Sequence, residues 1–339
     1  MLQVMRRSVL AFVIALVASC GRPSTSTSSG APEETIFDLA GDPTAHVEVA
    51  PAGSATPRVL TDPCSGPSTL AVGPRDLLID GGATIRTVFV DAPPVDPAQP
   101  SAARPLLLAY HGWGGDPEQL ERTTGLTAAA LARGFVVVRP LGVGKSFNAG
   151  ACCGDATDAA IDDVGFARTL VATIAAETCI DRRRVFVTGF SNGGFLSHRL
   201  ACEAADVFAA VASVGGTFGI TTCAPSRPVS VLQIHGKIDG IVKFAGDEAR
   251  HWSSVATVID AWVRADRCKL DGAREVFAHG SARCVRSGPC EGEAEVTLCR
   301  DDRAGHTWPG GPRSVGYGGS QDLDATSFIL DFFGRHPMP

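Results

Sequence analysis

The apolar residues of this chain gather in segments of two alternating kinds. Short, continuous apolar runs are typical of strands buried on both faces, and they occupy residues 106–110, 135–138, 185–187, 209–214 and 229–234. Longer segments with helix-compatible sequences occupy residues 117–133, 162–178, 195–203, 255–265 and 328–333. Because strands alternate with helices, the pattern predicts an α/β fold with a mostly parallel central sheet covered by helices on both faces.

Less regular segments predict further strands and one helix start. Partly polar strands are expected at residues 84–90, near 274–277 and near 295–298. The helix at 117–133 should begin with Asp116 as its N-cap and with Pro117 at its first position, where a missing N–H costs nothing.

The N-terminus has the pattern of a targeting signal. Arg6 and Arg7 precede the apolar run Val9–Ala18, which is too short to span a bilayer as a helix. The run leads into Ser19-Cys20 and resembles a bacterial lipobox, in which the cysteine is lipidated and becomes the mature N-terminus. An ordinary secretory signal cut near Ser19 is the alternative. Residues 1–19 are thus a predicted signal peptide, and we expect an exported protein, either lipid-anchored to the cell envelope through Cys20 or secreted.

Composition separates a tether from a folded domain. Residues 20–62 are rich in Ser, Thr, Pro, Gly and Ala, a composition that buries too little apolar surface to offset the entropy of ordering. We expect a flexible tether there and one folded domain over residues 63–339. The net charge of −6 offers no basic surface for nucleic acid. Of 11 cysteines, those other than Cys20 are even in number, as disulfides in an oxidising compartment require. No Cys-x-x-Cys or His-Glu-x-x-His spacing supports a metal site.

The predicted strand at 185–187 runs into Gly189-Phe190-Ser191-Asn192-Gly193, and a predicted helix follows. This order is typical of a nucleophile elbow, a turn so tight that side chains at its flanking positions would crowd it. The free N–H groups at the start of the helix would also face any oxyanion that forms at Ser191. The pattern predicts Ser191 as a nucleophile.

A serine nucleophile needs a base, and the base needs an acid that fixes its tautomer. In such folds the acid follows the serine and the histidine comes last. Asp239 lies in a loop just beyond the strand at 229–234, and His306 lies in a glycine-flanked loop near the end of the chain, so both suit these roles. A loop-stabilising turn is the alternative role for Asp239. The rival acids, with poorer context, are Asp247, Asp301 and Asp302.

An oxyanion hole needs two preorganised N–H donors. The backbone of Asn192, directly after the nucleophile, is one expected donor. The other is expected from Trp113 in the loop Gly112-Trp113-Gly114, which follows the strand at 106–110. A simple turn between strand and helix is the alternative role for that loop.

Six motifs in this order resemble one family, the secreted polyhydroxybutyrate depolymerase-like esterases, which include the feruloyl and acetylxylan esterases of carbohydrate esterase family one. The motifs are His111-Gly112-Trp113-Gly114-Gly115, Cys152-Cys153, Asp162-Asp163-Val164-Gly165-Phe166, Gly189-Phe190-Ser191-Asn192-Gly193-Gly194, His235-Gly236-Lys237-Ile238-Asp239 and Gly305-His306-Thr307-Trp308-Pro309-Gly310.

The resemblance covers roughly residues 64–335. It implies an α/β-hydrolase fold, no cofactor, and a triad of Ser191, Asp239 and His306. Lys237 departs from the small residue or threonine that family members often have there, so we expect the pocket edge to differ in this chain. Asp162 and Asp163 match a family motif, and we expect them to cap and anchor a helix.

These observations favour an exported serine esterase that acts through an acyl-enzyme on feruloyl or acetyl esters of plant polysaccharide. Exposed aromatic faces can stack on a phenolic group or a sugar, so Trp113 and Trp308 are expected to contact substrate; packing into the domain is the alternative. Oligomers of hydroxybutyrate are the second substrate class. The competing functions are a peptidase or acyltransferase with the same triad, and a non-catalytic binding protein on a hydrolase fold. We expect a monomer that meets the membrane only through its N-terminal lipid.

Two expectations concern the disulfides. Cys202 ends the helix after the elbow and Cys223 lies on the loop that returns toward it, which favours a Cys202–Cys223 bond. Cys152 and Cys153 are expected to pair with other cysteines, because the ring that a bond between neighbours closes is strained.

The lipobox interpretation predicts that Cys20 is acylated and that the mature protein fractionates with membranes. Mass spectrometry of the mature N-terminus tests this directly. An unmodified N-terminus on a soluble exported protein would contradict it.

Overall fold

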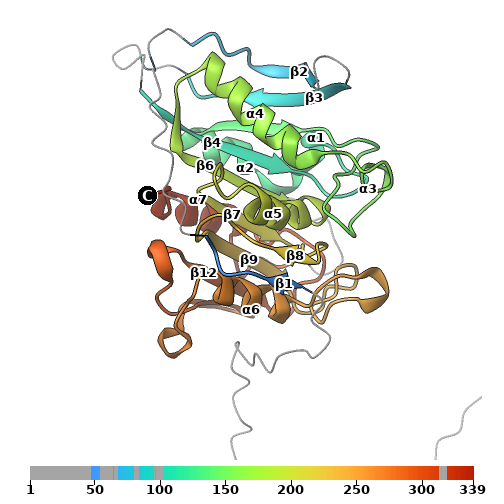
Figure 1. Cartoon of the computed structure of the whole chain (residues 1–339), viewed down its shortest axis with the longest axis vertical. Helices are drawn as coiled ribbons and strands as arrows, with labels where there is room; N and C mark the ends of the chain where they lie inside the picture. The colour runs from blue at the N-terminus through green and yellow to red at the C-terminus, as the bar shows by residue number, and fades with distance from the viewer. Residues whose placement is uncertain are drawn as a thin grey trace, which may run out of the picture. The chain divides into compact units, whose positions relative to one another are not determined.

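A computed structural model describes residues 47–53, 64, 68–79, 84–94, 96, 102–312 and 319–339. Its main sheet has ten strands in the order β10-β11-β12-β9-β7-β6-β4-β5-β3-β2. The strands from β12 to β5 in this order are parallel, and antiparallel strands extend the sheet at both sides. Figure 1 shows the sheet running through the length of the domain. The predicted α/β fold with a mostly parallel sheet is confirmed.

The strands of this sheet are β2 (Gly73–Ile79), β3 (Thr84–Asp91), β4 (Arg104–Tyr110), β5 (Val136–Pro140), β6 (Ile180–Phe190), β7 (Ala210–Val214), β9 (Ser230–Gly236), β10 (Arg274–His279), β11 (Ala282–Arg286) and β12 (Val296–Asp301). The α-helices are α1 (Pro117–Thr124), α2 (Leu126–Ala132), α3 (Asp155–Asp158), α4 (Asp163–Glu177), α5 (Asn192–Glu203), α6 (Val255–Ala265) and α7 (Ala325–Arg335). In the part of the chain that the structure describes, no helix has the length and apolar character needed to cross a membrane.

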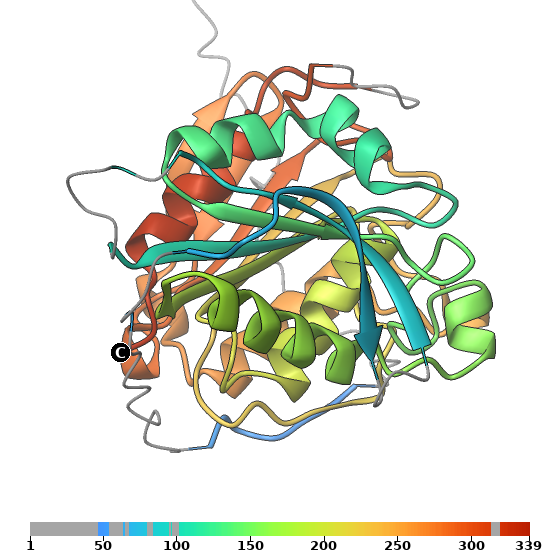
Figure 2. The same ribbon diagram turned by 90° about the horizontal axis from the view of Figure 1, so that it is seen from above.

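Helices cover both faces of the sheet, as Figure 2 shows from above. One apolar cluster packs α4, α5 and α6 against one face, and a second packs α1, α2 and α7 against the other. The helix predicted at 117–133 is divided into α1 and α2 because Gly125 adopts a left-handed conformation, with φ of 61°, between them. Its predicted start is confirmed, since the Asp116 carboxylate accepts a hydrogen bond from Gln119 N.

The strand β3 carries a buried charge that its sequence pattern does not reveal. Arg86 points inward while the neighbouring Ile85 is 63% exposed. The Arg86 guanidinium donates to Asp163 Oδ1 over 2.9 Å, and Asp163 Oδ2 accepts from Asn148 N. Burial raises the pKa of Asp163, and the charge of Arg86 opposes that shift. Asp162 caps α4 through Gly165 N, so the expected capping and anchoring by the acid pair is confirmed.

All ten cysteines beyond Cys20 form disulfides, and Cys20 itself lies outside the described residues. The predicted Cys202–Cys223 bond is confirmed. The expectation for the neighbouring pair is wrong, because Cys152 and Cys153 are bonded to each other. The remaining bonds are Cys64–Cys179, Cys268–Cys290 and Cys284–Cys299.

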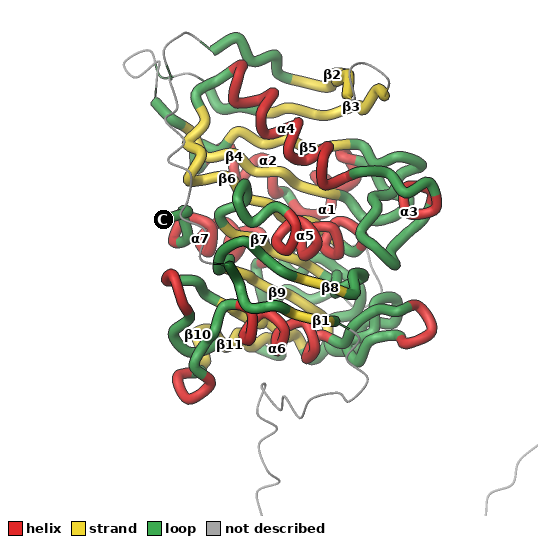
Figure 3. Tube along the Cα trace, in the orientation of Figure 1, coloured by secondary structure: helices red, strands yellow, loops and turns green. Residues whose placement is uncertain are grey.

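Residues 47–53, which fall within the expected tether, pair with the folded domain. Strand β1 (Glu48–Val49) pairs in parallel with β8 (Thr222–Cys223) in a second, two-stranded sheet, visible as neighbouring strands in Figure 3. Beyond β1, Ala52 N donates to Ala265 O and the Ala52 side chain is buried. The interpretation of residues 47–53 as tether is therefore wrong: backbone N–H groups of this segment donate to carbonyls of the domain, although the segment is short and rich in small residues.

We predict that Arg86→Met destabilises the fold by about 3–5 kcal/mol, because it leaves the Asp163 carboxylate buried without its cation. The free energy of unfolding in urea measures this loss. The double variant Arg86→Met/Asp163→Leu removes both charges and should lose less than the single variant. A double variant as unstable as Arg86→Met alone would contradict the electrostatic explanation.

Candidate active site

Ser191 lies in a strained turn between the end of β6 and the start of α5. Its φ is 55° and its ψ is −118°, a conformation that residues other than glycine rarely adopt. A Cβ on Gly189 would overlap the backbone of Gly193, and a Cβ on Gly193 would overlap the carbonyl of Tyr110. The Ser191 N–H donates to Val214 O over 2.8 Å, which ties the turn to the neighbouring strand β7. The predicted elbow geometry is confirmed.

Asp239 and His306 meet through a direct hydrogen bond. His306 Nδ1 lies 2.7 Å from Asp239 Oδ2, so an Nδ1–H donates to the carboxylate and Nε2 is the ring nitrogen that this bond leaves unused. The other carboxylate oxygen accepts from Ile241 N at 2.8 Å and from Val242 N at 2.9 Å. These two backbone donors orient Asp239, whose side chain is only 1% exposed. The carboxylate in turn fixes the plane and the tautomer of the imidazole.

His306 lies beside the elbow. Its ring packs against that of Phe190, the residue before Ser191, with 4.8 Å between the ring centroids and 34° between the ring planes. It also borders Gly215, where an added Cβ would lie 3.4 Å from the imidazole. In the part of the chain that the structure describes, no hydrogen bond joins Ser191 Oγ to His306 Nε2. In unliganded enzymes the hydrogen bond between a catalytic serine and its histidine is often long until substrate binds. The relevant observation is therefore that Ser191 and His306 lie at the same end of the sheet, beyond the carboxyl ends of its strands.

The rival acids have other partners. Asp301 accepts from Ser281 Oγ and from the backbone of Arg303 and Ala304, which shapes the loop that leads to His306. Asp247 pairs with Lys243 and Arg250, and Asp302 pairs with Arg300. Of the acids that the sequence offered, the structure thus brings Asp239 to the histidine.

Two backbone N–H groups beside Ser191 are free to bind an oxyanion. Within the described residues, neither Trp113 N nor Asn192 N donates a hydrogen bond. The neighbouring donors in the same loop are occupied, since Gly114 N donates to Lys145 O and Gly115 N donates to Gly112 O. Gly112 approaches Ser191 so closely that a Cβ on Gly112 would lie 3.2 Å from Ser191 Cβ.

His111 holds the loop that carries Trp113. Its Nδ1–H donates to Gly112 O at 2.7 Å, and its Nε2 accepts from Gly142 N at 3.0 Å. Burial lowers the pKa of His111, so the neutral form that this pattern requires is favoured. His111 is therefore a supporting residue that the sequence gave no role of its own.

The Asn192 side chain connects the elbow to the Cys152–Cys153 disulfide. It accepts from Phe147 N at 2.8 Å and donates to Phe147 O at 2.9 Å, and its Nδ2 lies 3.6 Å from Cys152 Sγ. Asn192 thus anchors the start of α5 through its side chain while its backbone N–H faces the site. Sequence reasoning recognised only the backbone group.

A buried chain of polar side chains supports the acid from behind. Trp262 Nε1 donates to His198 Nδ1, and His198 Nε2 lies 2.7 Å from Gln233 Oε1. Gln233 Nε2 then reaches His235 Nδ1 at 3.0 Å. His235 Nε2–H donates to Val242 O at 2.7 Å, on the turn that holds Asp239.

Both imidazoles of this buried network, those of His198 and His235, are neutral. Burial lowers the pKa of His198 to about 4, and burial also lowers the pKa of His235. The donor and acceptor pattern requires one proton on each ring, because His198 and His235 each accept at Nδ1 and donate at Nε2. The sequence shows His235 only as part of a motif, and it gives no signal for Gln233.

The two tryptophans differ, and one expectation is wrong. Trp308 is fully buried and its indole N–H donates to Thr326 Oγ1 at 2.9 Å, so it is a core residue that substrate does not reach. Trp113 is 64% exposed and its indole borders Gly154, next to the Cys152–Cys153 pair. Among the described residues, no group of three His, Cys, Asp or Glu side chains could hold a metal ion.

We predict that Gln233→Leu lowers kcat by between about tenfold and 100-fold with little change in KM, because the turn that positions Asp239 loses its buried support. Steady-state kinetics at several pH values measures the effect. Thr297→Val is a matched control, since it removes a buried hydrogen bond from the neighbouring strand β12 away from the acid turn. Equal losses of kcat in both variants would contradict the positioning role.

Comparisons with known proteins agree with this geometry. A model of the prolyl oligopeptidase family matches residues 126–242. The "Putative esterase NocK" of Nocardia uniformis subsp. tsuyamanensis is 32% identical over 338 residues, which cover 92% of each chain. Feruloyl esterase B of Piromyces equi is 29% identical over 222 residues, covering 60% of this chain and 40% of its own length.

The solved structures include an acetyl xylan esterase from Aspergillus awamori with a TM-score of 0.53 and 11% identity, covering 77% of this chain and 99% of its own. At that identity the likeness concerns the fold, which is that of an α/β-hydrolase. Its relatives and its fold make the chain a carboxylic ester hydrolase. The chain belongs to the family of α/β-hydrolase esterases that includes NocK and feruloyl esterase B.

Proposed function

We propose that this esterase is an exported serine hydrolase that cleaves feruloyl or acetyl esters of plant polysaccharide through an acyl-enzyme. Ser191, His306 and Asp239 are the nucleophile, the base and the orienting acid. The observation that carries this assignment is the 2.7 Å contact of Asp239 with His306, formed beside the strained elbow at Ser191. Five disulfides support a location outside the cytoplasm. Cys20 is the proposed lipidated residue, on the basis of the signal sequence that precedes it.

The reaction begins when Ser191 Oγ attacks the ester carbonyl carbon and its proton passes to His306 Nε2. Asp239 stabilises the imidazolium that forms, without taking the proton itself. The carbonyl oxygen gains a negative charge, and the N–H groups of Trp113 and Asn192 bind it. The C–O bond to the alcohol then breaks, and His306 donates its proton to the leaving oxygen. Water repeats the sequence on the acyl-enzyme and releases the acid.

The substrate assignment rests on exposed apolar side chains in the loops that carry the proposed oxyanion donor Trp113 and the acid Asp239. Trp113, Ile238 and Ile241 are each more than half exposed, and they lie in the oxyanion loop and in the acid loop. An exposed aromatic face and two aliphatic side chains suit the flat phenolic ring of a feruloyl group. The similarity to feruloyl esterase B supports the same class of ester.

We predict that Ser191→Ala, Asp239→Asn and His306→Ala each retain the fold and lose activity by a factor on the order of 10⁴. The losses should not multiply in double variants, because the three residues act as a unit. Hydrolysis of an aryl ester, measured beside circular dichroism, separates catalysis from folding. Near-full activity of Asp239→Asn would show that another acid serves His306.

We predict that Trp113→Ala raises KM for methyl ferulate more than KM for an acetylated xylo-oligomer, because only the first offers an aromatic ring to stack on. Trp308→Phe is the control: it should lower stability and leave both KM values unchanged. Steady-state kinetics on both esters, and on a hydroxybutyrate trimer, measures the ranking. Turnover confined to the trimer would overturn the polysaccharide assignment and leave the triad intact. Cleavage of peptides in preference to all three would favour a peptidase.

A further inference from the structure

A large pocket lies at the opposite end of the sheet from Ser191. Its volume is about 870 Å³, and its lining includes Ala209, Ser230 and Glu295, which lie at or directly before the amino ends of β7, β9 and β12. The loops of the candidate active site leave the carboxyl ends of the same strands. Since these strands have five to seven residues, the two sites are separated by roughly 20 Å.

The lining of this pocket is strongly basic. Five arginines contribute to it, namely Arg183, Arg227, Arg274, Arg286 and Arg335. The acidic side chains in the lining are Glu293 and Glu295. Because the whole chain has a net charge of −6, such a gathering of guanidinium groups is not a consequence of its composition.

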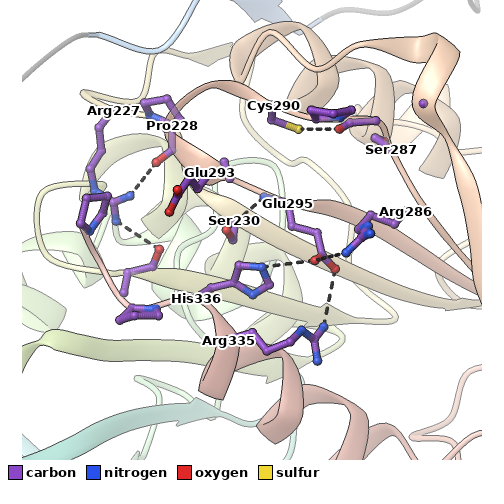
Figure 4. A pocket seen from close by; sticks show the side chains of 18 of the residues that line it. Arg227, Pro228, Ser230, Arg286, Ser287, Cys290, Glu293, Glu295, Arg335 and His336 are labelled. Atoms are coloured by element: carbon purple, nitrogen blue, oxygen red, sulfur yellow. Dashed lines mark hydrogen bonds and ion pairs between the residues drawn. The ribbon is translucent and has the colours of Figure 1, made fainter.

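The carboxylate of Glu295 forms ion pairs with several of these cations. Figure 4 shows Arg286, Arg335 and His336 directed toward Glu295. The separations to its oxygens are 3.3 Å for Arg286, 3.7 Å for Arg335 and 3.3 Å for His336. Burial alone would raise the pKa of Glu295, but the hydrogen bonds from His336 and Thr297 and the charges of His336 and Arg335 together outweigh it and lower the pKa to about 2. Glu295 is therefore already occupied and does not neutralise the other arginines.

Three arginines of the pocket have no ion-pair partner among the described residues: Arg183, Arg227 and Arg274. Arg227 is 7% exposed and donates to the carbonyls of Phe208, Ala209 and Pro228, while its Nε has no partner. Arg183 and Arg274 are exposed at the rim. Burial lowers the pKa of Arg227 to about 10, and the charges of Asp266 and Asp206, which form no ion pair with it in the described part of the chain, only partly oppose that shift. A bound anion would therefore stabilise this guanidinium further.

A hydroxyl in the pocket also lacks a partner. Ser287 is 4% exposed, and its Oγ makes no hydrogen bond in the described part of the chain. Buried hydroxyls are normally hydrogen-bonded, so Ser287 Oγ has hydrogen-bonding capacity left for a ligand of this pocket. The lining thus combines spaced cations with a free hydroxyl.

We propose that this basic pocket binds an oligosaccharide that carries carboxylate groups, at a site distinct from Ser191. Planar guanidinium groups bind carboxylates with two parallel hydrogen bonds, and the sugar hydroxyls would meet Ser287 and the backbone of the lining. A volume of about 870 Å³ suits a ligand of several rings rather than a single small anion. The binding site does not depend on the ester that Ser191 cleaves.

Titration calorimetry at low salt on the full chain carrying Ser191→Ala tests the site with three probes. Trigalacturonate, a uronic acid trisaccharide, should bind with one-to-one stoichiometry. Neutral galactotriose should not bind, and inorganic phosphate should bind more weakly than trigalacturonate. Binding of galactotriose as tight as that of trigalacturonate would overturn the proposal, and so would equal binding of phosphate, which would indicate a small-anion site.

Arg183→Ser/Arg274→Ser, added to the same chain, should weaken trigalacturonate binding roughly tenfold or more, because two carboxylate contacts are lost. Arg122→Ser removes an exposed arginine of α1 outside the pocket and should bind as the parent does. Unchanged affinity in the double variant would overturn the proposal.

A readout on the unsubstituted pocket does not depend on how these variants fold. The imidazole NMR signals of His336, assigned from the spectrum of His336→Gln, should shift on titration with trigalacturonate while those of His306 stay in place. Shifts at His306 alone would place the ligand at the active site and refute a separate pocket.

Discussion

Parallel pairing of β9 with β12 sets the distance between the acid and the histidine. The pairing joins His235 to Arg300 and Gly236 to Asp301, so both strands end at the same level. Beyond the sheet, the acid loop and the histidine loop stay paired, since Lys237 N donates to Asp301 O and Ile238 N donates to Ala304 O. A slip of one residue in this register would turn every side chain of one strand to the other face and separate Asp239 from His306.

The electrostatics of the site follow from burial. The Asp239 carboxylate is buried, and two backbone N–H groups and an imidazole N–H point at it. Behind it, burial keeps His198 and His235 neutral, so no second positive charge competes for the carboxylate. The donors are therefore in place before substrate arrives, which is what electrostatic preorganisation requires.

The local sequence pattern was sufficient to predict those elements that only one type of residue can form. Buried apolar runs predicted the central strands, and Gly189 and Gly193 identified the elbow because only glycine fits there. Prediction from the sequence failed where contacts with residues distant along the chain determine whether a side chain is buried. The contexts of Trp113 and Trp308 look alike along the chain, but Thr326 on α7 binds the indole of Trp308 and takes it into the core. Strand β2 lies at one edge of the sheet and β11 lies beside the opposite edge strand, β10. Both contain charged residues, and their apolar alternation is too weak to predict them.

The docking of residues 47–53 has a practical consequence for recombinant expression. A shortened chain that began at residue 63, where composition first suggests the domain, would lack β1 and the segment after it. The carbonyls of Thr221, Cys223 and Ala265 would lose their N–H donors, and β8 would become an open strand edge. Unpaired strand edges pair with other chains. We therefore expect the truncated protein to self-associate and to be poorly soluble.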